Sequence, residues 1–216
     1  MNYKELKQRQ RAERHTHNEN LALRTHRSLS WLNRAEQAED LDGQFIFLWI
    51  AFNAAYATEI DERLRLSEQE TFKAFLNKLC QLDQNNTLEK LVWQAFPNSI
   101  RVLLDNPYVF QSFWDYQSGK LTHDQWQQRF SAGKHRAKTA LGSRDTATVL
   151  AVVFSRLYTL RNQLIHGGAT WNSQVNREQM RDCVAILGQL VPLVIEIMLD
   201  NPNTLWGDAC YPVVQP

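Results

Sequence analysis

The sequence has little glycine, proline or cysteine. Eight glycines and six prolines in 216 residues are few for a turn-rich β architecture, so the composition favours helices. Cys80, Cys183 and Cys210 are odd in number and far apart, which fits neither a disulfide framework nor a zinc-binding spacing. We therefore expect a reducing, cytoplasmic setting.

Long hydrophobic runs are also missing. The longest, residues 45–57 and 191–199, are shorter than the roughly 20 apolar residues that a membrane-spanning helix needs. Residues 1–17 contain no apolar segment of the kind found in signal peptides. We expect no membrane association, and interpret both runs as core helices.

Several familiar signatures of enzymes are not found in the sequence. It has no glycine-rich phosphate loop, no paired carboxylates at a helical metal spacing, and no serine or cysteine nucleophile motif. His15 and His17 are two residues apart, so on a helix they point in different directions, and no acidic or cysteine partner is near. We therefore expect neither a metal nor a cofactor.

The formal net charge is only +1, but charge is unevenly distributed. Residues 1–34 and 129–161 are basic, whereas residues 35–70 are acidic. Such segregation is typical of a surface that binds a polyanion, although a solvated helix face gives the same pattern. The candidates for such contacts in the second basic stretch are Lys134, Arg136, Lys138, Arg144 and Arg156.

The hydrophobic periodicity predicts an all-α helical bundle formed by a single domain, residues 1–216. Residues 1–38 are a candidate helical arm, formed by a long helix over 3–38, and residues 201–216 an irregular tail. The later helices are expected at 43–60, 67–83, 123–140, 144–166 and 176–199, with two or three short helices within 86–117.

Local signals set the expected helix boundaries. Asp40 or Asp42 is a candidate cap for the second helix, and Thr122 for the helix from 123. Ser67 with Glu70 resembles a capping box, and Asn176 is expected to open the last helix. Pro97 and Pro107 should break the chain, while Pro192 should kink the last helix or start a new one.

The segment TLRNQLIHGGATW, residues 159–171, ends a helix whose apolar stripe consists of Leu150, Val153, Leu157, Leu160 and Leu164. Asn162 and His166 are four residues apart and lie roughly opposite this stripe. Arg161 lies at its edge beside Phe154, Tyr158 and Ile165, which suggests a second packing surface. Taken alone, His166 and Gly167 also fit an ordinary helix end.

Arg161, Asn162 and His166, followed by Gly167 and Gly168, resemble the signature of the HEPN superfamily (higher eukaryotes and prokaryotes nucleotide-binding domains). The apolar segment FIFLWIAFNAAYA likewise resembles the central helix of that family. The resemblance implies an all-α bundle, metal-independent RNA cleavage and a symmetric dimer whose motifs meet. It is also compatible with a toxin or anti-phage defence effector that has an antitoxin or regulatory partner. The alternative is a non-catalytic helical module that binds nucleotide or RNA or regulates a partner.

The residue types suit this chemistry. Imidazole in general titrates near neutrality, which suits His166 to proton transfer from a ribose 2′-OH, and a guanidinium such as that of Arg161 can bind phosphate. Asn162 could orient the imidazole or hold a phosphate oxygen. Arg161 and His166 are about 140° apart on an ideal helix, so two helices related by a two-fold axis would bring them together more easily than one.

Other residues are weaker candidates. Asn53 is a polar residue inside an apolar helix, either a hydrogen-bonded core residue or a polar neighbour of the motif. Trp126, Tyr158 and Trp171 could stack on RNA bases, with core packing as the alternative.

Overall fold

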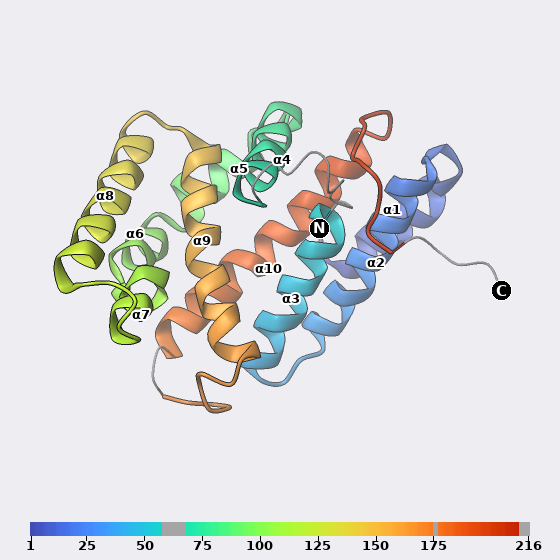
Figure 1. Cartoon of the computed structure of the whole chain (residues 1–216). Coiled ribbons are helices and arrows are strands. Elements are labelled where there is room, and N and C mark those ends of the chain that lie inside the picture. Colours follow the sequence, from blue (N-terminus) through green and yellow to red (C-terminus); the bar gives the residue numbers. More distant parts are fainter. Residues whose placement is uncertain (58–67, 175–176, 212–216) are drawn as a thin grey trace. The chain divides into compact units, whose positions relative to one another are not determined.

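A computed structural model describes residues 1–57, 68–174 and 177–211, and these form helices and no β-strand (Figure 1). The all-α prediction is confirmed. Contacts divide the chain, which we expected to form one domain, into two compact units. Unit 1 contains residues 1–84 and 184–216, and unit 2 contains residues 85–183. The last helix, α10 (Arg177–Asp200), supplies residues to both units.

Unit 1 begins with α1 (Tyr3–Glu13), a 3-10 turn (Arg14–Thr16) and α2 (Glu19–Glu36). The single long helix over 3–38 is therefore a wrong prediction. His17 has an extended backbone, and the Asn18 side chain starts a new helix by accepting a hydrogen bond from Leu21 N. Helix α1 packs against α2 and buries Leu6 and Gln10.

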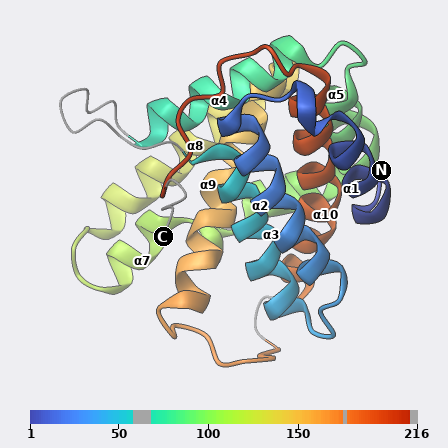
Figure 2. The same cartoon turned by 90° about the vertical axis from the view of Figure 1, so that its right-hand side faces the viewer.

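Helix α3 (Leu41–Tyr56) runs beside α2, as Figure 2 shows. Asp40, one of the two expected caps, accepts a hydrogen bond from Gly43 N at 2.8 Å. Phe45, Leu48 and Phe52 are buried, in agreement with the predicted core helix. Ser28 Oγ on α2 donates to the carbonyl oxygen of Ala51 on α3 at 2.7 Å, which links the two helices.

Unit 1 also contains α4 (Glu68–Leu82), the second part of α10 and the tail. Ser67 and the side chain of Glu70, the expected capping box, lie outside the described residues, as does Asn176. Helix α10 runs without interruption through Pro192, so a new helix does not start there. Among the described helices, α10 alone is long and apolar enough to cross a membrane, but 67% of its most apolar window is buried, as in a core helix.

Unit 2 contains the short helix α5 (Thr87–Lys90), a π-helical turn (Leu91–Ala95), α6 (Pro97–Asp105), the 3-10 turn η4 (Pro107–Val109) and α7 (Gln111–Gln117). Pro97 and Pro107 break the chain as predicted, each at the start of a new helical segment, where a missing N–H costs little.

Two longer helices, α8 (His123–Gly142) and α9 (Thr146–Ile165), complete unit 2 and pack against each other (Figure 1). Thr122 and Gln125 form a capping box at the start of α8, which confirms the predicted cap. Asp145 caps α9 by accepting a hydrogen bond from Thr148 N at 3.0 Å. Helix α9 also contacts α6 and η4, so unit 2 holds it on several sides.

Candidate functional site at the end of α9

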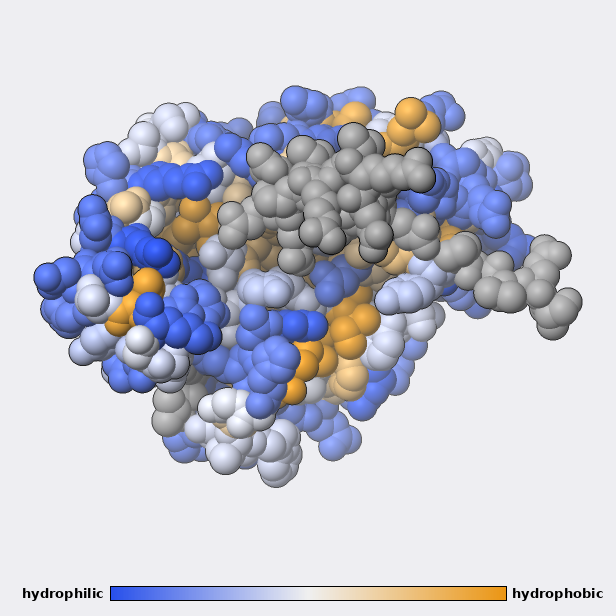
Figure 3. All heavy atoms as spheres, viewed as in Figure 1, coloured by the Kyte–Doolittle hydropathy of each residue, from blue (hydrophilic) through white to orange (hydrophobic). Residues whose placement is uncertain are grey.

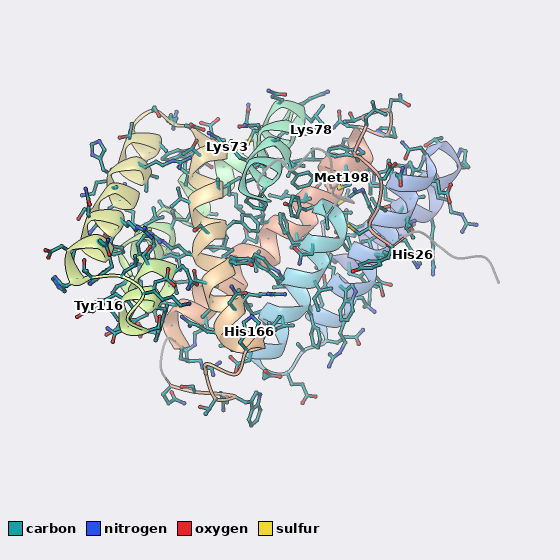
Figure 4. All side chains as sticks on the ribbon, viewed as in Figure 1. His26, Lys73, Lys78, Tyr116, His166 and Met198 are labelled. Carbon is teal, nitrogen blue, oxygen red and sulfur yellow. The ribbon has the colours of Figure 1, made fainter. Side chains whose placement is uncertain are left out.

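The apolar stripe fixes the orientation of α9 within the fold. Leu150, Val153, Leu157 and Leu160 are buried, as the periodicity predicts, and Leu164 is half-buried. His166 is exposed at the end of the helix (Figure 4). The helix is therefore buried along this stripe and presents the last residue of the motif to solvent.

The two glycines after His166 terminate α9 in a Schellman motif. Gly167 N donates to Leu164 O at 3.2 Å, and Gly168 N donates to Gln163 O at 2.7 Å. Gly167 has a φ of 69°, a conformation that residues with a side chain rarely adopt. A Cβ at residue 168 would lie 3.3 Å from the Gln163 carbonyl oxygen. Both glycines thus fix the backbone position from which His166 projects.

Arg161 and Asn162 contact each other directly. Arg161 Nη1 donates to Asn162 Oδ1 at 2.9 Å, and the guanidinium carbon lies 6.0 Å from the ring centroid of Tyr158. Arg161 Nε is buried without a hydrogen-bond partner among the described residues. Asn162 therefore orients the arginine here, and its expected contact with the histidine ring or a phosphate oxygen stays a prediction.

The side of α9 that carries Gln163 contacts η4, a contact that the sequence did not predict. Gln163 Nε2 donates to the carbonyl oxygen of Tyr108 at 2.7 Å, and Trp114 Nε1 donates to the same oxygen at 2.8 Å. Tyr108 and Trp114 are 49% and 38% exposed. No local signal at residue 108 announces a contact with residue 163, because the contact depends on tertiary packing.

The basic stretch behaves less uniformly than its sequence suggests. Lys134 Nζ lies 2.6 Å from Asp105 Oδ1. Arg144 has an exposed side chain 3.8 Å from Glu89 Oε1, and its guanidinium carbon lies 6.0 Å from the Trp93 ring centroid. Both cations therefore already have partners within unit 2.

Arg156 is buried, and the expectation that it binds RNA is wrong. It is 1% exposed, and its guanidinium carbon lies 4.2 Å from the ring centroid of Phe110 and 5.9 Å from that of Phe130. Burial lowers the pKa of its guanidinium to about 10. It is held by aromatic rings rather than by a carboxylate, and an RNA backbone on the surface cannot reach it.

Arg136 and Lys138 are exposed on α8, where the visible surface is mainly hydrophilic (Figure 3). Residues two positions apart on a helix project about 200° apart, so the side chains of Arg136 and Lys138 point to different sides of α8. The basic stretch therefore does not form one continuous basic face, and Arg136 and Lys138 remain individual candidates for RNA contacts.

The remaining candidates separate by burial. Trp126 is 8% exposed and its ring stacks on that of Tyr116, so it is a core residue. Trp171 is 75% exposed, in the loop after the motif. Asn53 is half-buried on α3, in the unit that does not contain the motif, and its proposed role stays a prediction. No group of three potential metal ligands occurs within the described ranges.

No family model, curated protein or solved structure matches the chain. The resemblance to the HEPN superfamily therefore rests on residues 161–168 and on their helical context.

Proposed function

We propose that the chain is a HEPN-like, metal-independent endoribonuclease that acts as a homodimer. The observation that carries the proposal is the end of α9. An exposed histidine, whose backbone a Schellman motif fixes, follows five residues after an arginine that an asparagine orients at 2.9 Å. This arrangement supplies an imidazole and a guanidinium, which suit the proton transfer and the charge stabilisation of phosphodiester cleavage by an internal nucleophile.

The proposed reaction requires one base and one electrostatic stabiliser. His166 takes the proton from the ribose 2′-OH, the 2′ oxygen forms a bond to phosphorus, and the bond from phosphorus to the 5′ oxygen breaks. The protonated imidazole then returns its proton to the departing 5′ oxygen. Arg161 binds the oxygens on which negative charge develops, and donors remain for this because only Nη1 is engaged by Asn162.

The geometry of α9 supports the proposed dimer. Arg161 and His166 project about 140° apart, so one helix presents them poorly to a single phosphate. A two-fold axis near the end of α9 would place Arg161 of one chain beside His166 of another. Tyr158 and Ile165, which are 42% and 49% exposed, supply apolar surface next to Arg161 for such a contact.

The cellular role that the resemblance suggests is a toxin or anti-phage defence effector, controlled by an antitoxin or other regulatory protein. The cytoplasmic setting belongs to the same proposal. It agrees with the three cysteines, which are odd in number and far apart in the sequence.

The decisive experiment is cleavage of total RNA in EDTA by the wild type, His166→Ala and His135→Ala. His135 is an exposed histidine on α8 outside the motif and serves as the matched control. Loss of the general base should lower the rate by about 10²- to 10⁴-fold, whereas His135→Ala should cleave like the wild type. Equal EDTA-resistant cleavage by all three proteins would refute the role of His166.

Absence of cleavage by the wild type would favour the second candidate, a non-catalytic RNA-binding module. Arg161 then provides the test, since its Asn162-oriented guanidinium suits phosphate binding even without cleavage. Loss of RNA affinity in Arg161→Ala would support this module, and unchanged affinity would leave Arg161 without a role in RNA binding.

A further inference from the structure

A hollow of about 460 Å³ lies in unit 2 beside the segment that contacts α9. Val102, Pro107 and Tyr108 provide its apolar lining. Val102 and Tyr108 are 51% and 49% exposed, so apolar surface here stays in contact with water. An exposed aromatic ring in a hollow is a common platform for a planar ligand.

The same hollow carries polar groups suited to a nucleotide. Arg101, Asp105 and Gln179 line it, and Lys134 Nζ lies 2.6 Å from Asp105 Oδ1. Carboxylate and amide groups match the hydrogen-bonding edge of a nucleobase, and the guanidinium suits a phosphate. Arg101 in the lining and Lys134 beside Asp105 place two cations near this hollow, which suits a nucleic acid.

The backbone of Tyr108 is fixed against the motif-bearing helix. Its carbonyl oxygen accepts hydrogen bonds from Gln163 and Trp114, and its N–H donates to Asn106 Oδ1 at 2.9 Å. Gln163 precedes His166 by three residues, which is less than one helical turn. The backbone of Tyr108 is therefore anchored to α9 near His166, and its ring packs edge to face on Phe113 with the centroids 5.3 Å apart.

We infer that this hollow binds a nucleobase of single-stranded RNA next to the cleavage site, with the base stacked on Tyr108. The inference rests on the proposed function and adds a base-binding subsite outside the motif. A base inside a duplex is paired and stacked on its neighbours, whereas an unpaired base can turn out into the hollow. The hollow therefore selects unpaired segments such as loops.

The test is RNA binding by proteins that carry His166→Ala, so that the RNA stays intact. Fluorescence anisotropy compares a short single-stranded RNA with an abasic strand of equal length. Tyr108→Ala should weaken binding of the normal strand by about 5- to 150-fold, the range expected for one lost stacking contact, and should not weaken binding of the abasic strand. Tyr108→Phe keeps the ring and should bind like the parent.

Tyr211→Ala is the matched control, because Tyr211 is an 85% exposed tyrosine of unit 1. Three results would overturn the inference: unchanged affinity in Tyr108→Ala, an equal loss for both strands, or an effect of Tyr108→Ala on self-association alone. In each case, RNA cleavage that depends on His166 would still uphold the proposed function. A parent that binds no RNA would refute the inference, and the EDTA experiment would judge the nuclease separately.

Discussion

Arg156 and Arg136 differ in environment although they belong to the same basic stretch. Arg156 is buried against Phe110, with its pKa lowered to about 10 by burial, whereas Arg136 is exposed. A buried, unpaired charge carries a desolvation cost that the aromatic contact offsets in part. Charge counted along the sequence therefore overstates the positive surface available to RNA.

This contrast gives a paired prediction. Arg136→Ala should weaken RNA binding and reduce the slope of log affinity against log salt by up to about 1, as expected for one lost phosphate contact. Arg156→Met fills similar space without a charge, so it should leave RNA affinity unchanged and unfolding free energy within about 1 kcal/mol of the wild type, or higher. Binding at several salt concentrations and urea unfolding provide the measurements. A loss of RNA affinity in Arg156→Met but not in Arg136→Ala would contradict the placement of Arg156 in the core and of Arg136 at the RNA-binding surface.

The arrangement of the motif could be predicted only in part. Helical periodicity predicts that the apolar stripe is buried and that His166 is not, because the direction of each side chain follows from its position in the helical repeat. The hydrogen bond from Arg161 to Asn162 could not be predicted, since adjacent residues on a helix point about 100° apart. The bond forms because the arginine side chain is long enough to reach the side chain of Asn162, the next residue.

At the scale of the element, the end of α9 depends on two glycines. Gly167 adopts a φ of 69° and Gly168 lies close to the Gln163 carbonyl, so a helix stop and the placement of His166 have the same structural cause. The sequence predicted this helix end from the glycines alone.

Gly167→Ala should destabilise the protein by about 1 kcal/mol, because a Cβ in the left-handed region is strained. Gly142→Ala is the control, as its φ is not positive and a Cβ there meets nothing within 4 Å. Urea unfolding of both variants measures the difference. Equal stability of Gly167→Ala and the wild type would mean that the strained turn does not hold the end of α9.

The helices whose ends carry strong local signals were predicted best. Thr122 with Gln125 caps α8 as expected, because a capping box involves only residues three apart. The break between α1 and α2 was missed because residues 14–18 contain neither glycine nor proline. There, packing of α1 against α2 and the Asn18 cap override the continuous helical pattern.

At the scale of the whole molecule, unit 1 is closed by contacts between distant parts of the sequence. Arg24 is 1% exposed and donates to the carbonyl oxygens of Ala55 at 2.9 Å and Asp208 at 2.8 Å. Arg27 donates to those of Cys210 and Tyr211, both at 2.6 Å. The irregular tail was predicted, but its attachment to α2 was not, because nothing local links residues 24 and 208.

Arg24→Ala should lower the free energy of unfolding by at least about 2 kcal/mol, since buried carbonyl groups would lose a charged donor. Arg11→Ala removes an exposed arginine of α1 and should change stability by less than about 0.5 kcal/mol. Denaturant unfolding gives both values, and limited proteolysis shows whether the tail is released. Similar stabilities for the two variants would contradict the role of Arg24.

The central claim, a site shared between two chains, is tested most directly by mixing Arg161→Ala and His166→Ala proteins under conditions that allow subunit exchange. Each variant alone should be inactive. After exchange, about half of all dimers contain one chain of each variant. Each of these has one intact Arg161–His166 pair of the two in a wild-type dimer, so the mixture should recover about a quarter of the wild-type cleavage rate in EDTA. No recovery, with subunit exchange confirmed by differently tagged chains, would contradict the shared site.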